Sequence, residues 1–273
     1  MTTPDSGSTG SARPLAVVTG ASSGIGLELA KQFAEHDFDV VVAAEDPGIE
    51  VAADVLRSFG SQVTPVQADL STYEGCEQLV SQVAAKGRPV EALALNAGVG
   101  SGGPFDETDL RKELEVIAVN VTSTVHLAKR FIPPMVERGA GKVLITSSIA
   151  STQPGPYEAV YAASKAFDQS FAEAIRSELK DSGVTVTSLM PGVAQTNFFS
   201  RADMDDTRAG SDEKMQDDPA KVAEQGFEAL MKGEQKVVAG NPLNKVMAAV
   251  GRITPDSAKA AAHKLLSKPG SGE

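Results

Sequence analysis

Residues 15–26 read L-A-V-V-T-G-A-S-S-G-I-G, a short apolar run that leads directly into a glycine-rich turn. The run Leu15–Thr19 is apolar and contains β-branched residues, which is typical of a buried strand. After the turn, Ile25, Leu29 and Phe33 share one stripe at helical spacing. The stretch therefore predicts a strand, a tight turn and a helix, which is the first unit of a parallel α/β sheet.

The three glycines of this turn have separate expected uses. Gly20 permits the tight turn, Gly24 lets the backbone approach a ligand, and Gly26 lets the helix pack closely on the sheet. The free N–H groups and the dipole at the helix N-terminus favour a pyrophosphate there. A turn with a purely structural role is the alternative.

An acidic pair follows the second expected strand. The run 39–44 (D-V-V-V-A-A) ends at Glu45 and Asp46, about twenty residues after the glycine turn. An acidic side chain at that spacing usually binds the hydroxyls of an adenosine ribose. Turn, spacing and acid together favour a dinucleotide site over a structural turn.

Strands and helices alternate along the rest of the chain, with no internal repeat and no linker between two cores. We therefore predict an α/β protein with a single-domain Rossmann fold, a doubly wound parallel sheet with helices on both faces. Pro133 and Pro134 are expected to break the longest helix late. Further strands are expected at 62–67, 90–95, 142–146, 184–190 and 236–239, and further helices at 49–59, 73–85, 109–136, 157–181 and 219–231.

The predicted organisation has three parts. Residues 1–13 are expected to be a disordered leader because they are polar and lack the pattern of a signal peptide. Residues 14–242 are expected to form the catalytic domain, with a long substrate loop at about 195–218. Residues 243–273 are expected to form a helical tail.

Bulk composition excludes several classes of partner. A net charge of −11 leaves no basic stripe for a nucleic-acid backbone, and no apolar run is long enough to span a membrane. The single cysteine, Cys76, cannot form an intramolecular disulfide, which fits a reducing, cytoplasmic location. The three histidines, His36, His126 and His263, lack metal-ligand spacing, so no metal is expected.

A possible proton-transfer pair lies near the middle of the chain. Tyr161 and Lys165 are four residues apart, so they share one face of a helix. A nearby ammonium favours the phenolate and lowers the pKa of a tyrosine. Ser147 and Ser148 end the preceding strand, where a hydroxyl could bind a substrate carbonyl oxygen. A core tyrosine beside a solvated lysine is the alternative.

Other strand ends also carry polar residues. Asp69 follows the third strand, where it could cap the next helix or reach an adenine amino group. Asn96 and Gly98 follow the fourth strand. Asn120 lies in the middle of an apolar helical segment, where it must find hydrogen-bond partners, and either core packing or function would explain it. Ligands of such sheets bind in the crevice at the carboxyl ends of the strands.

Together these motifs closely resemble those of the short-chain dehydrogenase/reductase family. The spacing in that family selects Ser148 over Ser147, and only Tyr161, unlike Tyr157, has a lysine four residues later. The matching motifs cover residues 14–200 in the family's order: T-G-A-S-S-G-I-G at 19–26, D-L at 69–70, N-A-G at 96–98, Asn120, S-S at 147–148, Y-A-A-S-K at 161–165 and P-G-V-A-Q-T at 191–196.

The resemblance implies an NAD(P)-dependent oxidoreductase that transfers a hydride between a nicotinamide and an alcohol, ketone or aldehyde. Tyr161 would be the general acid in reduction and the general base in oxidation, and Ser148 would steady the substrate oxygen. Lys165 would bind the nicotinamide ribose and lower the pKa of Tyr161. Asn120 would hold a water that links Lys165 to solvent. A non-catalytic dinucleotide-binding sensor is the alternative, and the intact set of four residues argues against it.

The resemblance also implies a cofactor site. The residues of this site would contact four parts of the cofactor. The pyrophosphate would be held by Gly20, Ser22, Ser23, Gly24, Ile25 and Gly26, and the adenosine by Glu45, Asp46, Asp69 and Leu70. The riboses would be held by Asn96, Ala97, Gly98, Tyr161 and Lys165, and the nicotinamide carboxamide by Pro191, Gly192, Val193 and Thr196.

The expected cofactor is NAD in preference to NADP. Relatives that use NADP usually carry arginine or lysine at the positions of Ser23 or Glu45, and a carboxylate would repel a 2′-phosphate. Many relatives that use NAD carry an aspartate one place earlier, where this chain has Ala44. The family also often has an asparagine where Leu95 stands, a small departure at a strand tip.

The expected substrate is a small-molecule alcohol or carbonyl compound. Phe198, Phe199 and Met204 could form an apolar pocket wall, or could anchor the loop that carries them. A homodimer or homotetramer is also expected from the resemblance, through the helices at about 109–136 and 157–181.

Overall fold

The computed structural model describes residues 13–242, 244–245 and 254–272. Most of the predicted leader therefore lies outside the described residues, as does part of the predicted tail. Arg13, which that leader included, is held in place: its guanidinium donates to the carbonyl of Gly60 at 2.9 Å and pairs with Asp37 at 3.2 Å.

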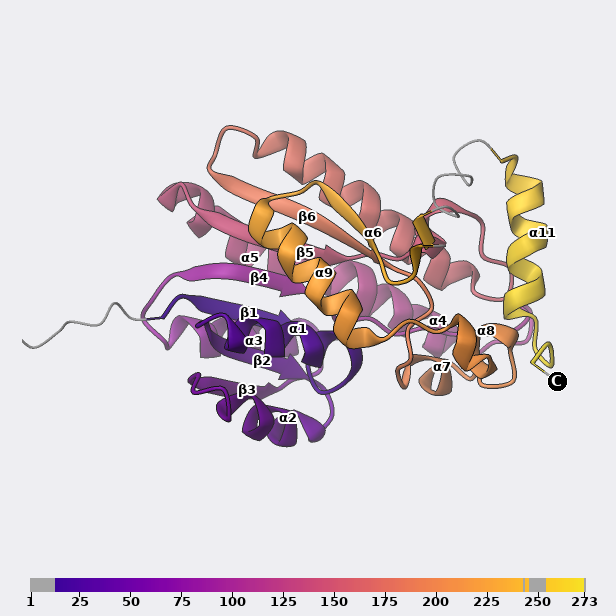
Figure 1. Cartoon of the computed structure of the whole chain (residues 1–273), viewed down its shortest axis with the longest axis horizontal. Helices are drawn as coiled ribbons and strands as arrows, with labels where there is room; N and C mark the ends of the chain where they lie inside the picture. The colour runs from indigo at the N-terminus through magenta and orange to yellow at the C-terminus, as the bar shows by residue number, and fades with distance from the viewer. Residues whose placement is uncertain (1–12, 243, 246–253, 273) are drawn as a thin grey trace, which may run out of the picture.

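A parallel sheet of seven strands, in the order β3-β2-β1-β4-β5-β6-β7, forms the centre of the described molecule (Figure 1). The chain starts in the middle of the sheet at β1, builds outward to β3, and then returns to β4 on the other side of β1. This reversal is the switch point at which doubly wound sheets bind ligands. The predicted fold is confirmed. The strands are β1 (Leu15–Thr19), β2 (Asp39–Ala44), β3 (Val63–Gln67), β4 (Val90–Leu95), β5 (Gly141–Thr146), β6 (Val184–Pro191) and β7 (Lys236–Ala239).

Helices cover both faces of the sheet. Adjacent residues of one strand enter opposite cores: Ala16 and Val18 belong to one core, and Leu15 and Val17 to the other. Both faces are apolar, which explains why the strands read as continuous apolar runs. The first core is covered by α1 (Gly24–Glu35), α2 (Gly48–Arg57) and α9 (Pro219–Lys232), and the second by α3 (Tyr73–Ala84), α5 (Ser123–Arg138) and α6 (Ala159–Glu178).

The long helix expected at 109–136 is three segments. Helix α4 (Leu110–Val116) passes into a π-helix at Ile117–Thr122, and α5 follows. Asn120 lies inside the π-helical turn. A π-helical turn inserted into an α-helix usually accompanies a functional site.

The prediction that Pro133 and Pro134 break this helix is wrong, because α5 continues to Arg138. The prolines lack the N–H groups that would donate to the carbonyls of Lys129 and Arg130. All four residues are exposed, so water can satisfy those carbonyls and the helix tolerates the loss.

The segment at 195–218, expected to be a long substrate loop, contains short helices. It contains α7 (Phe198–Arg201), α8 (Arg208–Ser211) and a 3₁₀ turn at Glu213–Met215. Helix α11 (Asp256–Ser267) lies beside it at one end of the molecule (Figure 1). The residues after α11 join the same segment, since the Gly272 N–H donates to the carbonyl of Asp206 at 2.9 Å. No helix within the described ranges is long and apolar enough to cross a membrane.

Replacing Leu144 should test how strongly the sheet depends on its first core. Leu144 is fully buried in β5, so Leu144→Ala should lower the free energy of unfolding by about 3 kcal/mol, as measured by urea denaturation. Leu265→Ala is the matched control, because Leu265 is 70% exposed on α11 and should change stability by less than about 0.5 kcal/mol. Equal effects of the two substitutions would contradict the burial of Leu144.

Candidate active site

A cavity of about 960 Å³ opens at the carboxyl ends of the strands. It is lined by the glycine turn, by the tips of β2 to β6 and by the segments at 196–215 and 262–267. All of the site residues predicted from the sequence line it except Asn120. Residues as far apart along the chain as Gly20 and Thr196 are therefore brought to one place by the parallel topology.

The glycine turn forms a cradle that fits a pyrophosphate. Gly20 has a φ of +66°, which side-chain-bearing residues rarely adopt, and a Cβ on Gly26 would lie only 2.1 Å from the carbonyl oxygen of Gly20. A Cβ on Gly24 would lie 2.9 Å from the methyl carbon of Thr196. Ser23, the N-cap residue of α1, makes no side-chain capping bond, so the first N–H groups of the helix remain available to an anion.

The two acidic residues after β2 differ in their contacts. Asp46 accepts a hydrogen bond from the Ser22 hydroxyl at 2.6 Å and another from the Gly48 N–H at 3.0 Å. Asp46 therefore braces the glycine turn against the next loop. Glu45 is exposed at the edge of the cavity, which leaves its carboxylate better placed to meet a ligand.

Asn96 joins the ends of three strands. Its amide nitrogen donates to the carbonyl of Thr19 at 3.2 Å, and its amide oxygen accepts from the Thr146 hydroxyl at 3.0 Å. The Thr19 hydroxyl in turn accepts from the backbone N–H groups of Asn96 and Ala97, both at 3.0 Å. This residue, predicted to contact a ribose, holds the tips of β1, β4 and β5 together.

Asp69 does not cap the helix that follows it, one of the two roles left open by the sequence. Thr72 is the N-cap residue of α3, and its hydroxyl accepts from the Gly75 N–H at 3.0 Å. Asp69 instead accepts from the Ser71 N–H at 2.8 Å in a turn, with its side chain at the cavity. The residue lies too far before the first helical turn to supply the cap.

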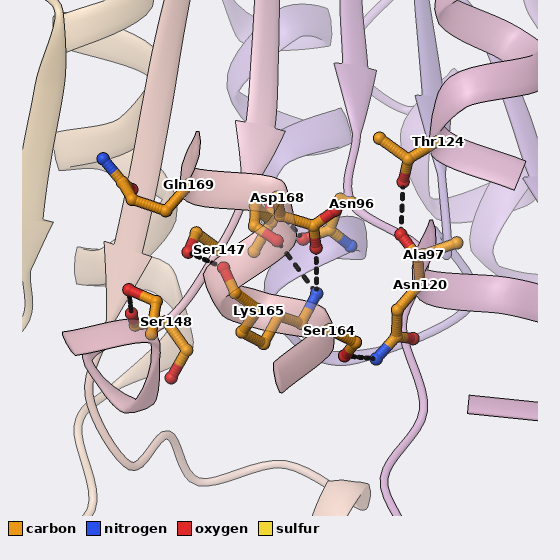
Figure 2. Close-up of polar contacts among 12 residues, drawn as sticks. Asn96, Ala97, Asn120, Thr124, Ser147, Ser148, Ser164, Lys165, Asp168 and Gln169 are labelled. Atoms are coloured by element: carbon orange, nitrogen blue, oxygen red, sulfur yellow. Dashed lines mark hydrogen bonds and ion pairs between the residues drawn. The ribbon is translucent and has the colours of Figure 1, made fainter. Parts of the chain in front are cut away.

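The two serines after β5 have different partners. The Ser147 hydroxyl donates to the backbone carbonyl of Lys165 at 2.8 Å and is buried (Figure 2). The Ser148 hydroxyl accepts from the Ala150 N–H at 3.1 Å and lines the cavity together with Tyr161, whose pKa it lowers. Ser147 therefore anchors α6 to β5, and Ser148 faces the phenol at the cavity.

The phenol of Tyr161 is kept protonated by its surroundings. Burial raises its pKa, and the carboxylates of Glu158 and Asp168 raise it further, whereas the hydrogen bond with Ser148 lowers it. The Phe198 ring lies 5.0 Å from the Tyr161 ring, between centroids, and covers the phenol. A protonated phenol in the wall of a cavity can donate its proton to an oxygen that becomes negative during a reaction.

Lys165 is buried beside this phenol, with only 4% of its surface exposed. Its ammonium donates to the carbonyl of Thr146 at 2.9 Å and to the carboxylate of Asp168 at 3.1 Å. An ammonium has three donors, so one remains for a ligand. A Cβ on Gly98 would lie 3.2 Å from the Lys165 nitrogen, so the glycine lets this loop pass close to the ammonium.

Asn120 acts through its neighbours because it is fully buried. Its side chain exchanges two hydrogen bonds with the backbone of Val99, at 2.9 and 3.0 Å, and donates to the Ser164 hydroxyl at 2.8 Å (Figure 2). Its carbonyl oxygen accepts from the Thr124 hydroxyl at 2.7 Å. The asparagine therefore joins the loop after β4 to α6, one residue before Lys165.

Several polar residues near the reacting groups were not predicted from the sequence. His263 of α11 hydrogen-bonds the Gln153 amide at 3.1 Å and lies 3.3 Å from the carboxylate of Glu158. No sequence pattern links residues so far apart. Asp168 could have been found, because it is three residues after Lys165 and therefore on the same helix face.

The apolar residues of the substrate loop divide between the two roles considered. Phe198 contacts Tyr161 and lines the cavity. Met204 is buried in a small cluster with Phe199, Ala202 and Ala209, which holds the loop together. Phe199 belongs to that cluster and also reaches the cavity wall.

Comparisons with known proteins agree with this geometry. Residues 14–207 match the model of the family described as short chain dehydrogenase. The chain is 38% identical over 185 residues to a 1-deoxy-11-beta-hydroxypentalenate dehydrogenase from Streptomyces exfoliatus, covering 66% of this chain and 67% of that protein. It is 34% identical over 186 residues to a short chain dehydrogenase from Pseudocercospora fijiensis, covering 67% of this chain and 60% of that protein.

Solved structures of similar proteins contain both forms of the cofactor. A short-chain dehydrogenase from Sphingobium yanoikuyae in complex with NADPH has a TM-score of 0.76 and 26% identity, covering 82% of this chain and 87% of the other. A short chain dehydrogenase/reductase from Burkholderia phymatum in complex with NAD has a TM-score of 0.77 and 25% identity, covering 88% and 92%. The chain therefore belongs to the short-chain dehydrogenase/reductase family, as predicted, and is an NAD(P)-dependent oxidoreductase of alcohol and carbonyl groups.

Proposed function

We propose that Tyr161 is the general acid and base of this oxidoreductase, that Ser148 orients the substrate oxygen, and that Lys165 supports both the cofactor and the phenol. The observation that carries the proposal is the placement of Tyr161 and Ser148 in the wall of one cavity, with the buried Lys165 ammonium on the same helix face as Tyr161. A sensor that only binds dinucleotides would not need this arrangement of proton donors.

The chain's own residues would manage the proton in this reaction. A bound nicotinamide would supply the hydride to the carbonyl carbon in reduction, or accept it in oxidation. As the carbon–oxygen double bond becomes single, Tyr161 would transfer its hydroxyl proton to the substrate oxygen, and the Ser148 hydroxyl would donate a hydrogen bond to that oxygen. The Lys165 ammonium would stabilise the phenolate until a proton returns from solvent, for which we propose a water held near Asn120.

Replacing Tyr161 tests the proton-transfer role. Tyr161→Phe should lower kcat about 100- to 10,000-fold, because the ring remains and only the transferable proton is lost. Turnover would be followed by the absorbance of the reduced nicotinamide, using a ketone found by screening alcohols and ketones with both cofactors. Tyr157→Phe is the control, because that phenol has no lysine four residues later and should leave kcat nearly unchanged. Near-normal turnover by Tyr161→Phe would refute the proposed role.

The preferred cofactor is proposed to be NAD. The exposed carboxylate of Glu45 at the cavity edge would repel the 2′-phosphate of NADP and could accept hydrogen bonds from the ribose hydroxyls of NAD. Asp46 already accepts hydrogen bonds from Ser22 and Gly48, so its main role would be to support the glycine turn.

Reversing the charge at Glu45 tests this preference. Glu45→Arg should move the ratio of NADH to NADPH dissociation constants about tenfold or more towards NADPH, because a charge-assisted hydrogen bond replaces a repulsion. Glu50→Arg is the matched control. Glu50 is also exposed but does not line the cavity, so this substitution makes the same change of charge away from the cofactor site. Tighter binding of NADPH than of NADH by the unmodified protein would contradict the proposal.

The chain is proposed to consist of a catalytic domain with its substrate loop and a helical tail, and the tail is proposed to help form the substrate pocket. We propose that α11 closes the substrate end of the cavity, since His263 and Leu266 line the same cavity as Tyr161 and Phe198. The apolar Phe198 and Leu266 favour a small-molecule alcohol or ketone with a hydrophobic body.

Removing the His263 side chain tests the role of α11. His263→Ala loses the contacts with Gln153 and Glu158, so KM for the ketone should rise about tenfold while the dissociation constant of the cofactor stays unchanged. His36→Ala serves as the control, because His36 is exposed at the end of α1 and does not line the cavity. A wild-type KM in His263→Ala would argue against a tail that shapes the pocket.

A homodimer or homotetramer in the cytoplasm is also proposed. Leu110, Leu114 and Ile117 are exposed along α4 and the π-helix, and Phe167 is exposed on α6, which gives these helices apolar surface to bury. Light scattering coupled to gel filtration would measure the assembly. A cytoplasmic location is supported by the single cysteine, Cys76, which is buried and unpaired.

A further inference from the structure

Asp168 is a buried carboxylate that the proposed reaction does not use. It is 1% exposed, and its Oδ2 atom pairs with the Lys165 ammonium at 3.1 Å (Figure 2). Its other oxygen, Oδ1, is also buried and has no hydrogen-bond partner among the described residues. A carboxylate in this position is costly to keep, because a buried charge needs full pairing.

A structural ion pair would not explain this position well. Lys165 already has a backbone acceptor, the carbonyl of Thr146 at 2.9 Å, and Ser147 anchors the same turn of α6 to β5. A neutral side chain at position 168 would leave these two contacts in place. The carboxylate therefore adds mainly its charge, beside the one ammonium on the helix face of Tyr161.

We propose that Asp168 is a positioning residue that directs the Lys165 ammonium and offsets its charge, so that Tyr161 stays protonated and ready to donate to a carbonyl substrate. The inference rests on the proposed function of Tyr161. The Asp168 carboxylate would bias the site towards carbonyl reduction, because a phenol that holds its proton is a ready acid and a poor base.

The electrostatics around the pair support this role. Burial raises the pKa of Asp168, and the Lys165 ammonium lowers it in opposition. The Asp168 charge raises the pKa of the Tyr161 phenol, and an ammonium such as that of Lys165 would act in the opposite direction. Removing the carboxylate should therefore lower the pKa of Tyr161.

Other charged residues share the cavity lining with Tyr161: Lys112 and Glu115 of α4, Arg201 of α7, and Lys214. Glu158, just before α6, raises the pKa of the phenol, and His263 of α11 contacts Glu158. Glu113 of α4, which packs against α6, is bonded to Ser101. The facing polar groups from β5, β6 and the π-helix are neutral: Thr146, Ser147 and Ser148, Ser188, and Asn120.

The test is a titration of Tyr161 that needs no substrate. The holoprotein with NAD⁺ is titrated by the ultraviolet absorbance of tyrosinate, and the same titration of a Tyr161→Phe background isolates the signal of Tyr161 from those of Tyr73 and Tyr157. Asp168→Asn, which keeps the shape and removes the charge, should move the Tyr161 midpoint to lower pH. Asp168→Ser offers a second neutral variant should the amide fit poorly.

The matched control is Glu178→Gln, which removes the same charge from the same helix at an exposed position about 25 Å from Tyr161 along the helix axis. Its Tyr161 midpoint should equal that of the unmodified protein. A midpoint in Asp168→Asn that is unchanged or moves to higher pH would overturn the inference. So would loss of NAD⁺ binding and of cooperative unfolding in both neutral variants, since Asp168 would then be a structural ion-pair partner.

Failure of the inference can be told apart from failure of the proposed function. If Tyr161→Phe abolishes turnover but the Asp168→Asn titration matches the unmodified protein, only the role of Asp168 is refuted. If Tyr161→Phe retains turnover, the proposed function itself is refuted, whatever the titration shows.

Discussion

The hydrogen bonds of Asn96 hold together the edge of the sheet on which the whole site depends. One side chain spans β1 and β5 by bonding Thr19 and Thr146. The glycine turn starts directly after Thr19, and Ser148, the proposed catalytic serine, follows Thr146 by two residues. Because the carbonyl of Thr146 also accepts from Lys165, a small shift of this edge would move the cofactor cradle and the proton-transfer groups together.

The electrostatics of the site are set by a balance around one phenol. Burial and the carboxylates of Glu158 and Asp168 favour the protonated form, whereas Ser148 favours the phenolate. A positively charged oxidised nicotinamide would shift this balance towards the phenolate.

The two ends of the cavity have different origins. The cofactor end is built from strand tips and one glycine turn, all close in space because parallel strands end at one edge. The proposed substrate end is lined by the segment at 196–215 and by α11, which contact each other through α8. Such segments can vary without disturbing the sheet, so the same chemistry can serve many substrates.

The sequence by itself determined the fold and most of the residues of the candidate site. Apolar runs mark the strands, and polar residues at their carboxyl ends must meet at one edge of a parallel sheet, so local patterns were enough. They were not enough for the π-helical turn at Asn120, or for the continuation of α5 through Pro133 and Pro134, which depends on the exposure of the carbonyls that lose their donors.

Only the tertiary structure decided which side chains contact one another and which charges interact. The hydrogen bond between Asn96 and Thr146 and the contact of His263 with Glu158 join residues that are far apart along the chain. No sequence pattern predicts such contacts. The charge on Asp168 matters because both it and Lys165 are buried, and a sequence shows spacing but not burial. Electrostatic effects depend on distance and on the exclusion of water, and both are properties of the folded chain.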